Sequence, residues 1–318
     1  MSEEENHRAL IPRPPSALER IGPGPRDILS RMVSDALALA RSKNTALNVA
    51  RFRIGNYEFC DPDYRQILQW AKALKLEPDE VVQRLDGSSV NTIWHGSFGF
   101  VVENGAIISL VLDFNLLPLT VFEWMEGLII RDLGFKGKPE VSPQLALRLS
   151  FLNRLYCCRI NLTELDLSKV PGLTYLWCSE NQLTELDLSK VPGLTLLQCF
   201  RNPLTELDLS KVPGLTYLWC SDNQLTELDL SKVPGLTFLQ CFRNQLTKLD
   251  LSKVPGLTNL CCSGNQLTKL DLSHVLGLTK LYCSENQLSE LDIRPLRNLN
   301  SYFHDPSVTL RKHREQKF

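Results

Sequence analysis

Residues 162–203 read LTELDLSKVPGLTYLWCSENQ followed by LTELDLSKVPGLTLLQCFRNP, and variants of this unit continue to Leu291. The unit recurs every 21 residues with its leucines at fixed offsets. One unit is too short to bury its own apolar edge, so it must stack on its neighbours as one coil of a solenoid. We therefore predict an α/β solenoid with a parallel β-sheet on one face and tight Val-Pro-Gly turns on the other.

Two columns of equivalent residues are predicted to lie inside the solenoid. In each coil the segment LxC forms a short strand whose leucine and cysteine point inward, and stacked strands lie about 4.8 Å apart. The cysteine column comprises Cys157, Cys178, Cys199, Cys220, Cys241, Cys262 and Cys283. The asparagine column comprises Asn181, Asn202, Asn223, Asn244, Asn265 and Asn286. The asparagines sit where the chain leaves the sheet, and a buried amide there can pair with backbone groups that the sheet leaves unpaired.

The ten cysteines of the chain are predicted to be reduced thiols. A regular column of identical thiols suits the preference of free cysteine for a packed core. The adjacent pairs Cys157-Cys158 and Cys261-Cys262 lack the CxxC spacing of a zinc site. We therefore expect no metal site, no disulfide and no cofactor.

The segment LxxLxCxxNQL over 173–183, with LDLS in the second half of each unit, resembles the cysteine-laddered internalins and related bacterial leucine-rich-repeat proteins. The resemblance covers residues 140–300. It implies a leucine-rich-repeat superhelix, and it implies binding to other molecules without naming one, because such families bind unrelated targets.

Outward-facing positions alternate between neighbouring coils, while inward positions stay constant. The strands read YLWCSE, LLQCFR, YLWCSD and FLQCFR in turn, which gives a second period of 42 residues. Aromatic side chains on a surface typically mark an interaction site. We predict that a protein or extended peptide binds this face through Tyr175, Trp177, Gln198, Phe200, Arg201, Tyr217, Trp219, Phe238, Gln240, Phe242 and Arg243.

Three alternatives stay open for the same residues. The rings could stack on one another across coils and only stiffen the sheet. Tryptophan and tyrosine flanked by glutamine and carboxylates also suit sugar rings, so the face could be a carbohydrate-binding module. The array could also be an architectural spacer or associate with itself.

The charges argue against nucleic acid as a ligand. Glu180, Arg201, Asp222 and Arg243 alternate in sign between neighbouring coils, so they can pair along the column. Nucleic-acid binding needs an unbroken basic surface, and the net charge of the chain is −1. A lysine column on the return face, from Lys169 to Lys253, is predicted to be solvated.

The rest of the chain divides into segments of different composition. We predict a disordered tail over 1–20, a helical N-terminal cap domain over 21–95, degenerate leading repeats over 96–150, regular repeats over 151–300, and a C-terminal cap with a basic tail over 301–318. Within the cap domain, apolar spacing predicts helices from near Arg26, over Asp63–Leu74 and over Glu77–Leu85.

No residue pattern indicates catalysis. Cys60 beside Asp61 and Asp63 resembles the cysteine–acid motif of bacterial leucine-rich-repeat ubiquitin ligases, but those enzymes carry a large catalytic domain after the repeats. The N-terminal MSEEENHRALIPRPP lacks the apolar core of a secretion signal, and no stretch is long enough to span a membrane. We expect a cytoplasmic, non-enzymatic, monomeric protein without membrane contact, and export by a signal-independent route stays open.

Overall fold

The computed structural model describes residues 52–54, 57–59, 61–74, 77–85, 99–103, 106–113, 130–136, 149 and 151–313. The tail over 1–20, the helix predicted from near Arg26 and the residue Cys60 lie outside these ranges.

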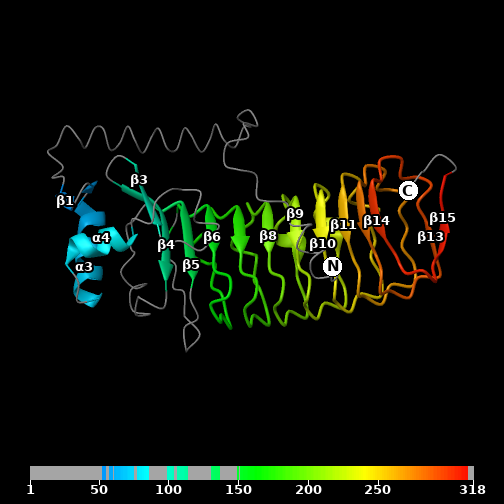
Figure 1. The fold of residues 1–318 in the computed structure, drawn as a ribbon, viewed down its shortest axis with the longest axis horizontal. Coiled ribbons are helices and arrows are strands. Elements are labelled where there is room, and N and C mark those ends of the chain that lie inside the picture. Colours follow the sequence, from blue (N-terminus) through cyan, green and yellow to red (C-terminus); the bar gives the residue numbers. More distant parts are fainter. Residues whose placement is uncertain are drawn as a thin grey trace. The chain divides into compact units, whose positions relative to one another are not determined.

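One sheet of eleven strands runs through the described chain, in the order β14-β12-β11-β10-β9-β8-β7-β6-β5-β4-β3. Figure 1 shows these strands side by side. Their bounds are β3 Gly99–Glu103, β4 Ala106–Asp113, β5 Asp132–Lys136, β6 Arg154–Tyr156, β7 Tyr175–Trp177, β8 Leu196–Gln198, β9 Tyr217–Trp219, β10 Phe238–Gln240, β11 Asn259–Cys261, β12 Lys280–Tyr282 and β14 Ser301–Phe303.

From β4 onward the strands pair in parallel, each with the next coil along the chain. Residues 21 apart are partners in the regular coils, as Tyr175 and Leu196 are. The coils before β6 are longer, as the pairing of Ser109 with Asp132 and of Asp132 with Arg154 shows. This parallel, one-coil register places equivalent side chains in straight columns.

The first strand departs from the sequence interpretation. We expected degenerate leading repeats over 96–150, but within this range β3 and β4 pair antiparallel, with Glu103 opposite Ala106. Two strands separated by only two residues can pair as a hairpin, whereas parallel pairing needs a long crossover connection. The region between Gly99 and Asp113 is therefore a strand pair at the end of the sheet, and the coil pattern begins at β4.

Two helices and a small strand pair precede the sheet. Strands β1 (Phe52–Ile54) and β2 (Tyr57–Phe59) pair antiparallel, and helices α3 (Asp61–Leu74) and α4 (Pro78–Leu85) follow. Helix α3 begins two residues before the predicted start, because a proline such as Pro62 fits the first turn of a helix. At α4 the backbone N–H of Glu77 donates to the Glu80 carboxylate at 3.1 Å, which pairs one of the groups that a helix start leaves free.

The apolar faces of these helices are buried. Ile67, Trp70 and Ala71 of α3 and Val81 and Val82 of α4 belong to the same continuous cluster of buried residues as the repeat leucines. The spacing of three and four residues in α3 places its buried side chains on one face. A capping role for the 21–95 segment stays a prediction.

The inside of each coil is filled by leucine and cysteine, as the sequence predicts. In the coil of β7, Leu173, Leu176 and Cys178 have no exposed surface. Each cysteine also donates its backbone N–H to the next coil, for example Cys178 to the carbonyl of Gln198 at 2.9 Å. Inward packing and inter-coil hydrogen bonds therefore repeat at every step.

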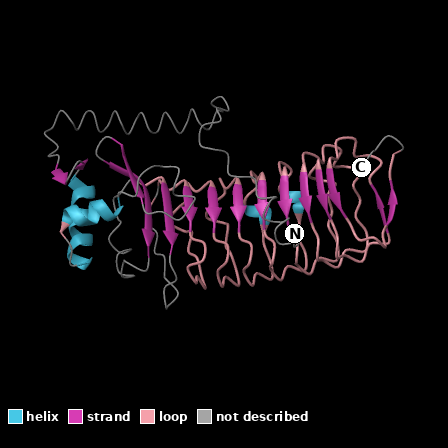
Figure 2. Cartoon of the chain, viewed as in Figure 1, coloured by secondary structure: helices cyan, strands magenta, loops and turns pink. Residues whose placement is uncertain are grey.

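The return side is made of turns (Figure 2). In coil after coil an aspartate carboxylate accepts from the backbone N–H two residues later, as Asp208 does from Ser210 at 2.9 Å. The return segments of the described repeats contain only two short 3-10 helices, Leu209–Lys211 and Leu230–Lys232. A coil of 21 residues has no room there for a longer helix.

The described chain closes with a half coil. Strands β13 (Glu290–Asp292) and β15 (Thr309–Arg311) pair in parallel beside the main sheet. The carboxylate of Asp305 accepts from the backbone N–H groups of Glu285 and Asn286, at 2.9 and 3.4 Å. In the preceding coil the backbone carbonyl of Ser284 accepts the bond equivalent to that of Glu285, from the N–H of Gly264. The Asp305 side chain therefore takes the place of a backbone carbonyl.

Candidate functional site: the outward face of the sheet

The outward face is defined here by four columns of residues that the parallel register aligns. The ring columns are Tyr175, Leu196, Tyr217 and Phe238 at the first strand position, Trp177, Gln198, Trp219 and Gln240 at the third, and Ser179, Phe200, Ser221 and Phe242 two residues later. The charged column is Arg159, Glu180, Arg201, Asp222 and Arg243. The structure thus brings all the predicted partner-binding residues onto one face.

The rings of this face pack against one another across neighbouring coils. Phe200 stacks on Trp219 with ring centroids 4.2 Å apart, and Tyr217 stacks on Phe238 at 4.1 Å. Trp177 stacks on Tyr156 of the preceding coil at 4.2 Å. Such contacts contribute about 0.5–1.5 kcal/mol each beyond their buried area.

Stacking leaves little ring surface exposed. Trp177 and Trp219 are each 6% exposed, while Tyr175, Tyr217 and Phe200 are half-buried. Trp219, Phe242 and Cys261 form a second buried cluster, separate from the core of the solenoid. The expectation of freely exposed aromatic anchors is therefore not met at the tryptophans, and a role of these rings in binding stays a prediction.

The 42-residue alternation has a packing cause. At its second and third ring-column positions, each coil from β7 to β10 has either tryptophan and serine or glutamine and phenylalanine. Each coil therefore has one large ring at these two positions. Phe200 of one coil then fills the space beside Trp219 of the next. Two large rings in one coil would compete for that space.

Four buried polar atoms on this face have no hydrogen-bond partner. They are the Oγ atoms of Ser179 and Ser221, Nε1 of Trp219 and Oε1 of Gln240. Trp219 and Gln240 are register partners on neighbouring strands. A buried donor or acceptor without a partner costs about 1–3 kcal/mol.

The charged column forms a continuous chain of ion pairs. Its links are Arg159–Glu180 at 2.6 Å, Glu180–Arg201 at 3.6 Å, Arg201–Asp222 at 3.8 Å and Asp222–Arg243 at 3.7 Å. The arginine side chains at 201 and 243 are 44% exposed. Exposed pairs of this kind contribute about 0.2–1 kcal/mol each.

Every residue of the charged column has a left-handed backbone. The φ angles are 52° at Arg201, 52° at Asp222 and 51° at Arg243, and the same position in the coil of β11 is Gly264, with φ 64°. Residues with a side chain are strained in this conformation by about 1–3 kcal/mol, and glycine is not. The ion pairs at most balance this strain, so stability alone does not account for the charges.

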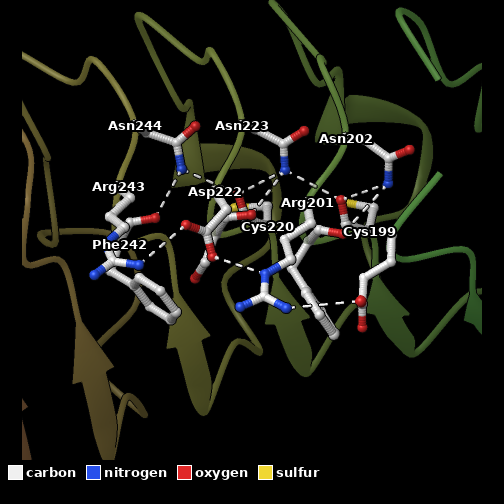
Figure 3. Close-up of polar contacts among 12 residues, drawn as sticks. Cys199, Arg201, Asn202, Cys220, Asp222, Asn223, Phe242, Arg243 and Asn244 are labelled. Carbon is white, nitrogen blue, oxygen red and sulfur yellow. Dashed lines mark hydrogen bonds and ion pairs between the residues drawn. The ribbon is translucent and has the colours of Figure 1, made fainter. Parts of the chain in front are cut away.

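Beneath the outward face the asparagine column joins neighbouring coils (Figure 3). The Oδ1 of Asn223 accepts from the backbone N–H of Leu204 at 3.1 Å. Its amide nitrogen donates to the carbonyls of Cys199, Cys220 and Ser221 at 3.1, 3.0 and 3.1 Å. Each asparagine thereby pairs backbone groups of two coils at the bend that positions the charged column.

Burial keeps the cysteine column protonated. Desolvation raises the pKa of Cys199 and Cys220 well above the ordinary range, and it raises the pKa of Cys283 to about 12. A protonated, inaccessible thiol is a poor nucleophile and a poor metal ligand. In the described part of the chain, no three histidine, cysteine or acidic side chains converge as metal ligands would.

Sequence reasoning missed two columns of this region. A threonine precedes each strand from β7 to β12, and its hydroxyl donates to a carbonyl of the preceding coil, as Thr216 does to Thr195 at 3.1 Å. The left-handed backbone of the charged column was also missed, although Gly264 in that column is a sequence signal for it.

Comparisons with known proteins bear on the fold. No protein-family model and no curated protein matches this chain. An internalin, InlF of Listeria monocytogenes, is similar in structure with a TM-score of 0.54 and 22% identity, over 68% of this chain and 64% of InlF.

Two other solved structures from Listeria monocytogenes match with lower TM-scores. The functional domain of InlJ, which includes a cysteine ladder, is 29% identical with a TM-score of 0.42, over 63% of this chain and 54% of that domain. Internalin C2 is 26% identical with a TM-score of 0.45, over 51% of this chain and 72% of its own. The chain thus spans about half the length of the InlJ domain that it matches.

The fold assignment rests on the 21-residue register of parallel strands together with the InlF likeness. The helices of the described ranges are all too short or too polar to cross a membrane. The repeat region of this chain is a leucine-rich-repeat solenoid with the fold of the internalins.

Proposed function

We propose that the repeat region is a non-enzymatic protein-binding module whose binding site is the outward face between β7 and β10. The observation that carries this proposal is a contrast with the coil of β11. That coil has the same register and the same inward residues, yet its four outward positions are Asn259, Cys261, Ser263 and Gly264. The fold therefore does not need rings or charges at these positions.

The charged column supports the same conclusion on energetic grounds. Glycine would remove the strain at each of its positions, as Gly264 does one coil later. Residues held in strained backbone conformations cluster at functional sites. Exposed arginines beside aromatic side chains are also the residue types enriched in protein interfaces.

Protein is favoured over carbohydrate because the ring planes are covered. A sugar stacks on the open face of an aromatic ring, but Phe200 covers Trp219 and Tyr156 covers Trp177. The face offers ring edges, amides and charges, which suit a protein surface. Catalysis by the cysteine column is disfavoured because its thiols are buried and protonated.

The test replaces outward residues in the coils of β9 and β10 by the equivalent residues of the coil of β11. The outward-face variant carries Trp219→Cys, Asp222→Gly, Phe242→Ser and Arg243→Gly. Its control carries Glu206→Ala and Lys211→Ala on the return side, where both side chains are exposed. Circular dichroism first establishes that both variants are folded.

Each immobilised protein is incubated with extract of the source cells, and retained proteins are identified by mass spectrometry. We expect a protein retained by wild type and by the return-side control but not by the outward-face variant, and its purified form should bind wild type directly. Equal retention by all three would place binding elsewhere. A tryptophan fluorescence change with a soluble glycan, lost in the outward-face variant, would favour carbohydrate instead.

A further inference from the structure

We propose that the partner of the outward face is a second copy of this chain, packed face to face with its coils in reverse order. This inference rests on the proposed function of the same face. It follows from the order of charges and of side-chain sizes along the columns.

The order of charges in the charged column is complementary to the same column of a second copy that runs in the opposite direction. From Arg159 to Arg243 the signs alternate at every coil, and the ion pairs hold the side chains in that order. Consider a two-fold axis that lies in the interface, runs along the strand direction and passes midway between β8 and β9. Each column then meets the same column of the second copy, with Arg201 opposite Asp222 and Glu180 opposite Arg243.

Charge restricts the axis to positions between two coils. An axis passing through β8 itself would place Arg201 opposite Arg201 and Glu180 opposite Asp222, which are like charges. An axis between two coils avoids this at every position. In the arrangement midway between β8 and β9, the remaining Arg159 meets Gly264, which carries no charge.

The same axis pairs large side chains with small ones in the second and third ring columns, while in the first ring column Tyr175 meets Phe238 and Leu196 meets Tyr217. In the third ring column Phe200 meets Ser221, and Phe242 meets Ser179. In the second ring column each tryptophan meets a glutamine, with Trp219 opposite Gln198. Interdigitation of this kind is what two packed sheets require.

A second copy matches the spacing of the face better than an extended peptide does. Charges of one sign recur every second coil, which is about 9.6 Å at a strand spacing of about 4.8 Å. Side chains on one side of an extended peptide recur every two residues, about 6.8 Å. A second copy has the same spacing between charges as this face, so its charges from Glu180 to Arg243 each lie opposite a charge of the first copy.

The interface is isologous, so each contact occurs twice. A face a few coils long and one short strand wide is small for a protein interface, and we expect weak association with a dissociation constant in the micromolar range, about 1–100 µM. The test is therefore sedimentation equilibrium of the full chain across this concentration range, where the mass should rise from 36.1 kDa towards twice that value.

Two charge variants test the arrangement. The basic variant carries Glu180→Arg and Asp222→Arg, and the acidic variant carries Arg201→Glu and Arg243→Glu. Each alone places like charges opposite each other, so we expect dimerisation to weaken by at least tenfold in each. An equimolar mixture places opposite charges together, and we expect heterodimers with affinity near that of wild type.

A control and a second measurement guard against misfolding. The return-side variant Lys211→Glu should dimerise as wild type does. For wild type itself, raising NaCl from 50 to 500 mM should weaken dimerisation several-fold by screening the charge pairs. Recovery in the mixture also requires that both variants are folded.

The outcomes separate this inference from the proposed function. A wild-type monomer at all concentrations overturns the inference, and so does a dimer that neither charge variant weakens. If the outward face is nevertheless needed to capture another protein, the proposed function stands. If the chain neither dimerises nor captures a protein through this face, both fail.

Discussion

The inward and outward sides of the same strands follow different rules. Inward positions repeat identically at every coil, with Leu197, Leu218 and Leu239 all fully buried. Outward positions repeat every second coil, with Trp219 between Gln198 and Gln240. An inward residue packs on copies of itself along the axis, so one residue type suits every step. An outward ring fills space that the neighbouring coil leaves empty, so sizes must alternate.

The comparison also separates what the fold requires from what it tolerates. The coil of β11 keeps the inward pattern with Leu260 and Cys262 fully or almost fully buried, but it has no aromatic ring in any of the three ring columns and has Gly264 at the position of the charged column. Stacking of the coils therefore requires the same residue types at the inward positions, but it does not require them at the outward positions. Four predictions test this division, beginning with the largest expected effect.

The inward cysteine column should make stability fall steeply at alkaline pH. Burial raises the pKa of its thiols in the folded chain, so folding stability is fully present below the unfolded pKa of about 8.5 and is lost as pH rises above it. One pH unit higher, each thiol removes about 1.4 kcal/mol. Urea unfolding under reducing conditions at pH 7, 8.5 and 9.5 measures this loss.

The seven thiols together would remove roughly 10 kcal/mol at pH 9.5, comparable to the whole stability of a typical domain. A Cys199→Ala, Cys220→Ala variant loses two of the titrating groups and should show a shallower pH dependence. An unchanged slope would mean that the column does not control alkaline unfolding.

Substitution of an asparagine of the asparagine column should lower the free energy of unfolding more than substitution of any other residue at the bend. Asn223→Ala leaves the backbone N–H of Leu204 without its partner. It also removes one of the hydrogen bonds that the carbonyls of Cys199, Cys220 and Ser221 accept. We expect a loss of about 3–5 kcal/mol in unfolding free energy, measured by urea titration. The exposed neighbour Gln224→Ala is the control and should change it by no more than about 0.5 kcal/mol.

A second ring in one outward coil should destabilise through overpacking. Ser221→Phe places a ring in the coil that already holds Trp219, and we expect a loss of about 1–3 kcal/mol. Ser263→Phe is the matched substitution in the coil of β11, where Cys261 leaves more room, and it should cost less. Equal losses in thermal unfolding would show that alternation is not a packing requirement.

The charged column should be nearly neutral for stability. Arg201→Gly removes ion pairs worth about 0.2–1 kcal/mol each but also removes the strain of a left-handed arginine. We expect unfolding free energy to change by less than about 1 kcal/mol. Arg201→Ala loses the pairs while keeping a side chain in strained backbone, and it should be the less stable of the two.

A large loss of stability in Arg201→Gly would assign the charged column to folding instead of binding. Together, these substitutions measure whether outward identity contributes to the fold at all.

Much of the fold follows from the repeat itself. The 21-residue period, the LxC segment and the Val-Pro-Gly turns predict the strand, the inward residues and the return turn of each coil, because each depends on local pattern and burial. The antiparallel pairing of β3 with β4 was not predicted, since an apolar run does not state the direction of its partner. The placement of the outward residues on one face was predicted from their alternation with buried ones.

The solenoid follows from the amino-acid sequence alone, because a series of near-identical units with one apolar edge buries that edge by stacking. Which outward groups are accessible to a partner depends on the tertiary structure. Rings from neighbouring coils cover the tryptophans. The side chains of the charged column form a continuous series of ion pairs, and each of these residues has a left-handed backbone conformation. These properties depend on contacts between coils and on backbone angles at the bend, which residue spacing does not contain.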